Sequence, residues 1–288
     1  MAAQERTMPF IKNLASSDRK IRTTALASLQ TFLSARQVAS ALAPLDVLKL
    51  WKGLFYALWM CDRAVPQQTL CAELAELVYI LPRGAVVPWL RGFWSTMARE
   101  WTSIDVLRME KFLLLVRRVL GASFRWMKGA SGKGGKEGTG AWDAERVDDV
   151  LTLLKEWPFA LELETQANQS PEEGEEHELD PLAPQNSIPV GMKLHVLDIW
   201  VDEAEKMGML ETEDEKAAKV LQRISNQVDL LEQGTISPAV RFRSKESLAD
   251  DRLPGNKKLP EAGKAASGNA DADMDGSEDG GSWDGFND

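Results

Sequence analysis

Four cations in the stretch that follows Ser103 have the types and the spacing to bind phosphate. At 3.6 residues per turn, Arg108, Lys111, Arg118 and Arg125 fall within about 100° of one another on a helix, although the interruption at Gly121 leaves the alignment of Arg125 open. The planar guanidinium of arginine can bind two phosphate oxygens at once. The spacing therefore predicts a phosphate-binding ridge, and the alternatives are a solvated face or pairing with the protein's own acidic insertion. The candidate phosphate contacts, with other cations of the front half, are Arg19, Lys20, Arg22, Arg108, Lys111, Arg117, Arg118, Arg125 and Lys128.

An aromatic stretch, LKLWKGLFYALWMCDR at residues 48–63, offers a second kind of surface. Trp51, Phe55 and Trp59 repeat at i, i+4 and i+8, which predicts one stripe of a helix. Each ring buries roughly 150–250 Å² when it is packed, so the stripe is either the centre of a core or a docking face. The candidate core or partner-docking aromatics are Trp51, Phe55, Trp59, Trp94 and Trp101.

Residues that could carry catalysis are sparse and badly placed for it. His177 lies in an acidic stretch, and His195 lies in an apolar helix, where a hydrogen-bonded packing role is favoured over a ligand role. The Gly-rich segment Gly129–Gly140 fails the phosphate-cradle pattern, because its best register begins at Ala130 and ends at Glu137. We therefore expect no enzyme activity, no cofactor, no metal and no small-molecule substrate.

The charges divide sharply along the chain. Residues 1–128 hold 18 Lys and Arg against 9 Asp and Glu, whereas residues 129–288 hold 16 against 35. This division indicates contact with a polyanion or an acidic partner, or else an acidic tail that serves solubility. Cys61 and Cys71 form no CxxC pair and are expected to be buried thiols in a reducing compartment. With no signal-peptide pattern and no apolar run of about 20 residues, we expect an intracellular protein without a membrane partner.

Helical periodicity dominates the elements that must position these residues. The pattern predicts helices capped at Ser17 and Asp46, opened at Pro66 and Pro88, and beginning at Ser103. Further helices are expected over 142–164 with a kink at Pro158, after Pro189, and from Thr212 to Gly234. Successive helices with short connections predict an all-α, HEAT-like solenoid of antiparallel helical hairpins.

The domain organisation follows from these elements and from composition. We expect basic N-terminal helical repeats over 1–128, a flexible Gly-rich loop over 129–141, and C-terminal helices of the same domain over 142–233. Within the last range, residues 165–187 are predicted to be a disordered acidic insertion. Residues 234–288 are predicted to be a disordered acidic tail, in which Trp283 and Phe286 are candidate short-motif anchors.

Four segments together resemble one family. PFIKNLASSDRKIRTTALASLQTFLSAR, LKLWKGLFYALWMCDR, REWTSIDVLRMEKFLLLVRRVL and GMKLHVLDIWVDE are similar, in order and spacing, to the ribosomal RNA processing protein 1 family of Nop52-like nucleolar proteins. The resemblance covers roughly residues 8–208, and the short tail looks like a fungal form. The Gly-rich loop and the acidic insertion depart from the family pattern.

The resemblance implies a helical, HEAT-like and non-enzymatic assembly factor of the large (60S) ribosomal subunit. It implies a nuclear, nucleolar location, scaffolding of pre-60S particles, and support for processing the precursor to the large-subunit and 5.8S rRNA. The implied partners are the pre-60S particle, pre-rRNA and other assembly factors, including Brix-domain and WD-repeat proteins. In that setting the basic front half is expected to meet RNA phosphate. The alternative is a protein-only helical adaptor that docks other assembly factors without touching RNA.

Overall fold

The computed structural model describes residues 10–35, 42–131, 135–161, 180–184, 187–211 and 213–256. Within these ranges the chain is helical, and an isolated antiparallel bridge between Lys128 and Trp142 is the only strand-like pairing. The 3₁₀ turns Leu77–Tyr79 and Trp101–Ser103 follow α5 and α6. The α-helices are α1 (Phe10–Leu14), α2 (Arg19–Ser34), α4 (Pro44–Trp59), α5 (Ala64–Glu76), α6 (Arg83–Glu100), α7 (Val106–Trp126), α8 (Ala144–Glu156), α10 (Val190–Lys206), α11 (Glu215–Gly234) and α12 (Pro238–Leu248).

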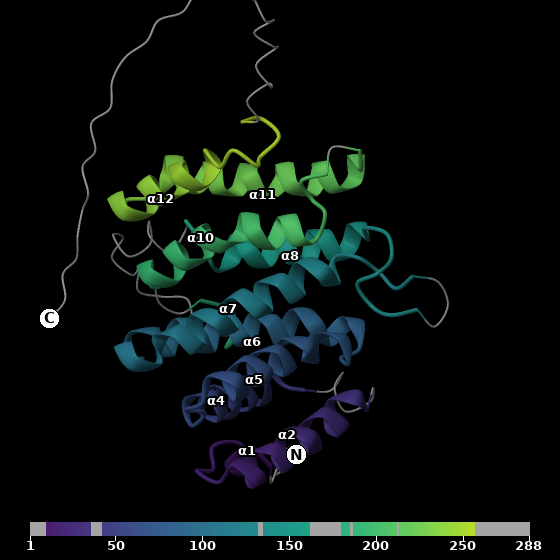
Figure 1. Cartoon of the computed structure of the whole chain (residues 1–288), viewed down its shortest axis with the longest axis vertical. Coiled ribbons are helices and arrows are strands. Elements are labelled where there is room, and N and C mark those ends of the chain that lie inside the picture. The colour runs from purple at the N-terminus through teal and green to yellow at the C-terminus, as the bar shows by residue number, and fades with distance from the viewer. Residues whose placement is uncertain are drawn as a thin grey trace, which may run out of the picture.

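The helices stack in two rows along the long axis of the molecule, with α1 and α2 at one end and α11 and α12 at the other (Figure 1). In the first row α1 packs on α4, α4 on α6, α6 on α8 and α8 on α11. In the second row α5 packs on α7, α7 on α10 and α10 on α12, whereas α2 makes no comparably close contact with α5. This arrangement confirms the predicted all-α, HEAT-like solenoid.

Aspartate side chains begin several of these helices. Asp18, Asp105, Asp143 and Asp214 each accept a hydrogen bond from a backbone N–H of the first turn, which satisfies a donor that has no partner inside the helix. The helix starts predicted from the sequence are displaced by a few residues. Asp18 rather than Ser17 caps α2, and Asp46 lies inside α4, which begins at Pro44. Pro66 and Pro88 likewise lie inside α5 and α6, which begin earlier at Ala64 and Arg83.

A continuous hydrophobic core runs between the two rows from Leu14 to Leu253. Its largest fully buried side chains include Trp89, Trp94, Trp157 and Trp200. Because each such ring removes roughly 150–250 Å² from water, these tryptophans contribute a large share of the apolar area that the core buries. No helix within the described ranges is long and apolar enough to span a bilayer.

The prediction that residues 234–288 form a disordered tail is wrong for the first part of that range. Pro238–Leu248 forms α12, and the indole N–H of Trp200 in α10 donates to Ser247 Oγ. Residues 257–288 lie outside the described ranges. The sequence misled here because α12 is polar over most of its surface and buries only Val240, Ser244 and Ser247.

Two other predicted boundaries also change. The acidic insertion is predicted to reach residue 187, but at residues 180–184 Leu182 is buried and Asp180 accepts a hydrogen bond from Arg91. Residues 165–179 of that insertion lie outside the described part of the chain. The helix predicted over 142–164 ends at Glu156, so Pro158 follows α8 and does not kink it.

Candidate functional site

Lys111, at the centre of the predicted ridge, is buried and is not exposed to solvent. Its Nζ donates hydrogen bonds to the carbonyl oxygens of Trp59, at 2.7 Å, and Cys61, at 2.8 Å, at the C-terminal end of α4. Burial lowers the pKa of Lys111, and the nearby carboxylate of Asp62 opposes that shift. An ammonium group at a helix C-terminus satisfies carbonyls that have no partner inside the helix and faces the negative end of the helix dipole.

The guanidinium groups of Arg108 and Arg125 are held against aromatic rings. Arg108 pairs with Asp105 and lies over the ring of Trp59, with its central carbon 4.9 Å from the ring centroid. Arg125 pairs with Glu76, and its Nε donates to Tyr79 Oη at 2.6 Å. Burial of Tyr79 raises the pKa of its phenol to about 12. Both guanidinium groups therefore already make ion-pair and aromatic contacts inside the protein, which leaves only part of each group for a phosphate.

The remaining α7 candidates differ in their surroundings. Arg117 lies 3.1 Å from Asp202 and 3.6 Å from Glu203, both in α10. Lys128 donates to the carbonyl oxygen of Met207 at 2.8 Å and lies over the ring of Trp142. Arg118 is exposed, and within the described ranges its side chain has no hydrogen-bond or ion-pair partner. The predicted exposed ridge is thus wrong as a geometry, because α4, α5 and α10 supply partners for most of it.

Ion pairs between helices in the middle of the stack connect the basic half of the sequence, residues 1–128, with the acidic half, residues 129–288. Arg83 of α6 pairs with Asp143 and Glu145, and Arg91 pairs with Glu156 and Asp180. Arg117 of α7 likewise pairs with Asp202 of α10. These contacts join the basic front half to the acidic back half inside one molecule. Contrary to the alternative, no ridge cation pairs with the acidic insertion among the described residues: Asp105 beside α7 and Glu76 of α5 supply the acids for Arg108 and Arg125.

On the three N-terminal helices, all cations except Arg22 lack a hydrogen-bond or ion-pair partner for the side chain within the described residues. Arg19 and Lys20 are exposed in the first turn of α2, and Arg22 donates to the carbonyl oxygens of Ser16 and Ser17 at 2.8 Å. Sequence reasoning missed three further exposed lysines, although the lack of any carboxylate in α1 and α2 was a readable signal. We call this set the basic end: Lys12, Arg19, Lys20, Arg22, Lys49 and Lys52. Within residues 10–35 and 42–60 only Asp18 and Asp46 oppose it.

The predicted aromatics lie mostly in the core. Trp51 is 2% exposed, and its indole N–H donates to the carbonyl oxygen of Trp89 at 2.8 Å. Phe55 stacks on Phe112 with ring centroids 4.5 Å apart. Trp94 and Trp101 are also buried, whereas Trp59 is half-buried beneath Arg108. The open choice between core and docking face is thus decided for the core at every position except Trp59.

Titratable groups that could do chemistry are engaged in packing. His195 Nε2 lies 2.9 Å from the carbonyl oxygen of Leu113, and burial lowers the pKa of its imidazole. Cys61 and Cys71 are buried free thiols, and burial raises the pKa of Cys71 to about 12. Across the ranges that the structure describes, no three His, Cys, Asp or Glu side chains gather as metal ligands.

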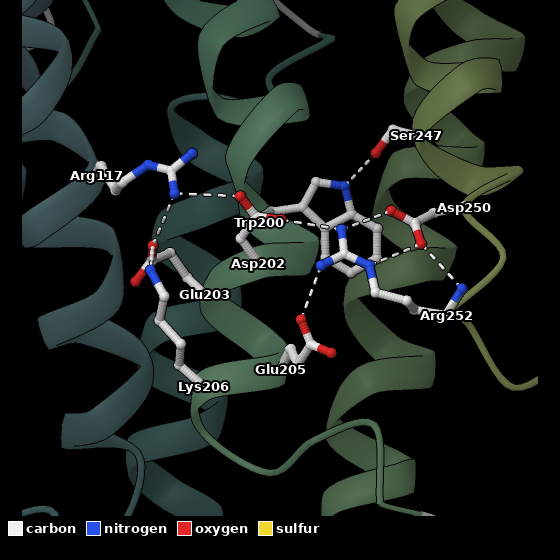
Figure 2. Close-up of polar contacts among 9 residues, drawn as sticks. All are labelled: Arg117, Trp200, Asp202, Glu203, Glu205, Lys206, Ser247, Asp250 and Arg252. Carbon is white, nitrogen blue, oxygen red and sulfur yellow. Dashed lines mark hydrogen bonds and ion pairs between the residues drawn. The ribbon is translucent and has the colours of Figure 1, made fainter.

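Cations on two sides of α10 pair with its acidic residues at positions 202–205 (Figure 2). Arg117 of α7 reaches Asp202 and Glu203, and Lys206 lies 2.6 Å from Glu203. From the opposite side, Arg252 lies 2.9 Å from Asp202 and 2.8 Å from both Glu205 and Asp250. We call these residues the α10 clasp: Arg117, Asp202, Glu203, Glu205, Lys206, Asp250 and Arg252. These contacts raise the pKa of the Arg252 guanidinium and lower that of the Asp202 carboxyl, and they join α10 to α7 and to the segment that follows α12.

Comparison with known proteins gives a consistent result. Residues 5–282 match the family model described as nucleolar protein Nop52. The mouse protein named ribosomal RNA processing protein 1 homolog A is 31% identical over 203 residues, covering 69% of this chain and 34% of the mouse protein. The human homolog B is 30% identical over 210 residues, covering 72% of this chain and 23% of the human protein, and a Drosophila melanogaster homolog is 32% identical over 133 residues, covering 44% and 19%.

The matched stretch thus spans between 19% and 34% of each of these three relatives. The family match extends over nearly the whole chain and confirms the resemblance read from the four segments. Its description as nucleolar agrees with the predicted nucleolar location. The chain belongs to the Nop52 family of nucleolar proteins.

Proposed function

We propose that this protein is a non-catalytic assembly factor in ribosome biogenesis, which scaffolds precursors of the large (60S) ribosomal subunit. It supports processing of the precursor to the large-subunit and 5.8S rRNA, and it works beside other assembly factors, including Brix-domain and WD-repeat proteins. The membership of the chain in the Nop52 family and the names of its relatives support a role in ribosomal RNA processing.

The RNA contact in this proposal lies at the basic end. The supporting observation is that its lysines and Arg19 are exposed and have no side-chain partners among the described residues, whereas most α7 cations are paired internally. A free cation that neutralises a phosphate releases condensed counterions, and this release drives binding without reading sequence. A cation that already holds a carboxylate must first release it.

Charge reversal tests this assignment. The variant Arg19→Glu, Lys20→Glu, Lys49→Glu, Lys52→Glu should co-sediment more weakly with pre-60S particles. Its affinity for single-stranded RNA should depend less on salt, with a slope lowered by about 0.7 for each phosphate that the variant no longer neutralises. The matched control is Lys155→Glu, Lys216→Glu, Lys219→Glu, Lys245→Glu, which changes the net charge equally at exposed lysines of α8, α11 and α12. Equal weakening of both variants would refute the assignment to the basic end.

A protein-only adaptor is the second candidate, because α8, α10 and α11 together carry more carboxylates than cations. Crosslinking in cells followed by sequencing of the attached RNA separates the two functions. Crosslinks at the basic end support direct RNA contact. An absence of RNA crosslinks from protein that still co-sediments with pre-60S particles favours the adaptor.

A further inference from the structure

A groove opens between α2 and α5, where the second row of helices is least tightly packed. Its volume is about 240 Å³, and its floor is formed by the apolar side chains of Leu14, Leu26, Ala57 and Leu70. The groove exists because α2 packs on α1 and leaves the facing side of α5 uncovered, whereas every later step of the row is closed by direct helix packing. We call it the α2–α5 groove.

The groove continues along α2 toward its C-terminal end. A second hollow, lined in part by Gln30, Ser34 and Ile80, shares Thr69 and Glu73 with the first. Sixteen helical residues give α2 a length of about 24 Å. The first hollow is smaller than the roughly 300–1,000 Å³ of sites that bury a small molecule. A long, shallow path with a pocket of this size suits an extended peptide that inserts one or two large side chains.

Positive charge at one end of the groove favours an acidic occupant. Arg19 and Arg22 line the pocket, and α2 contains no carboxylate. The Nη1 atom of Arg22 is held by two backbone carbonyls, while the Arg19 side chain has no partner within the described ranges. On the opposite wall the first hollow carries one carboxylate, that of Glu73, and the second hollow adds that of Glu76, which pairs with Arg125.

One segment of this chain outside the described ranges has the matching chemistry. Residues 277–288, SEDGGSWDGFND, carry Trp283 and Phe286 three positions apart among carboxylates and without a cation. The acidic insertion at 165–187 holds six carboxylates against four in this segment, but it contains no Trp, Phe or Tyr. Residues 257–282 can span about 90 Å when extended. At the roughly 8–10 Å between packed helix axes, the helix pairs of the described chain stack to only about 50 Å.

We propose that the α2–α5 groove docks the acidic segment 277–288 of the same chain. In this arrangement Trp283 or Phe286 fills the apolar pocket beside Val65, which is 73% exposed, and the carboxylates of the segment meet Arg19 and Arg22. The binding mode combines aromatic anchors with an electrostatic rim.

Photo-crosslinking of the full-length chain tests the proposal. A p-benzoylphenylalanine placed at Gly285 leaves both aromatic anchors unchanged. On irradiation it should form intramolecular crosslinks to peptides from residues 19–26 and 64–73, identified by mass spectrometry. Adding Val65→Glu with Arg19→Glu, or Trp283→Ala with Phe286→Ala, should lower the crosslink yield about tenfold or more.

The controls use exposed positions on helices that do not line the groove. Leu230→Glu on α11, where the leucine is 55% exposed, and Lys155→Glu on α8 should leave the yield unchanged. Crosslinks to other regions, no crosslinks, or crosslinked dimers that increase with protein concentration would each overturn the proposal. Since no RNA is present, this result does not depend on the proposed RNA contact.

Discussion

The Nζ atom of Lys111 in α7 lies 2.7 Å from the carbonyl oxygen of Trp59, the last residue of α4. A cation chosen from its spacing as a phosphate contact is therefore the C-terminal cap of a neighbouring helix. The guanidinium of Arg108 lies over the face of the indole ring of the same Trp59. Two of the segments by which the family is recognised thus meet at one junction between α4 and α7.

Replacing Lys111 by methionine should destabilise the fold while keeping most of the side-chain volume. The carbonyl of Trp59 would be left without a donor inside the protein, whereas that of Cys61 would keep the side-chain amide of Gln67, and the loss costs about 1–3 kcal/mol of the free energy of unfolding. Urea unfolding followed by circular dichroism measures this effect. The control Arg118→Met, at an exposed and unpaired side chain, should change the stability by less than about 0.5 kcal/mol. Equal stabilities of the two variants would argue against the capping role.

Gly121→Ala in α7 should also destabilise the protein, although alanine favours helix. A Cβ atom at Gly121 would lie 2.5 Å from Oε2 of Glu203, so the carboxylate would have to move away from Arg117 and Lys206. Overpacking of this kind costs about 1–3 kcal/mol, against a gain of about 1 kcal/mol from helix propensity. We expect a net decrease in stability in urea unfolding.

The matched control for that glycine is Gly84→Ala in α6. An added Cβ at Gly84 meets no atom within 4 Å, so helix propensity alone should act and the protein should become more stable by up to about 1 kcal/mol. A rise in stability at both positions would mean that the contact between α7 and Glu203 is not tight.

His195 should make the fold less stable as the pH falls below neutral. Burial lowers the pKa of His195, with the positive charge of Arg117 adding to the shift and the Leu113 carbonyl and Asp198 opposing it. Below the ordinary pKa of about 6.5 the unfolded chain therefore binds a proton that the folded chain does not. Stability falls from that pH downward until the lowered pKa is passed. Urea unfolding of His195→Gln and of the parent protein at pH 7.5 and 5.5 should show a smaller decrease in the variant, and parallel decreases would contradict the prediction.

Arg252→Met should loosen the C-terminal side of the stack without unfolding it. The guanidinium of Arg252 joins Asp202 and Glu205 of α10 to Asp250, but the side chain is 39% exposed, so solvent screens these pairs. We expect a decrease of about 1 kcal/mol in the free energy of unfolding. Hydrogen exchange should become faster in α12 while α4 and α6 keep their protection. Uniformly faster exchange would show instead that the clasp supports the whole fold.

Periodicity was enough to predict the helices and their stacking, because burial of one face per helix decides both. It did not predict α12, whose few buried residues are Val240, Ser244 and Ser247 and which lies in the expected disordered tail. A helix that is polar nearly all round carries little periodic signal. Its position depends on single contacts such as that between Trp200 and Ser247, which only the tertiary structure reveals.

The candidate site was predicted less well, for a different reason. Spacing identifies which cations share a helix face, but it does not identify what packs against that face. Lys111, Arg117 and Arg125 meet α4, α10 and α5 through contacts between residues 49 to 86 positions apart in the sequence. By contrast, Arg19 and Lys20 of α2 are exposed, as a phosphate contact must be, whereas Arg22 is half-buried and donates to two backbone carbonyls.

Freeing the acidic segment should strengthen RNA binding, if both the basic end and the α2–α5 groove act as proposed. Arg19 and Arg22 belong to both surfaces, so the docked segment competes with phosphate for them. The full-length variant Trp283→Ala, Phe286→Ala keeps all the carboxylates of the segment and should bind single-stranded RNA about three- to tenfold more tightly at low salt. Fluorescence anisotropy measures this increase, which should shrink as salt rises because both the competitor and the RNA are screened. With Arg19→Glu already present the increase should disappear, and an increase that persists in that background would separate the two surfaces.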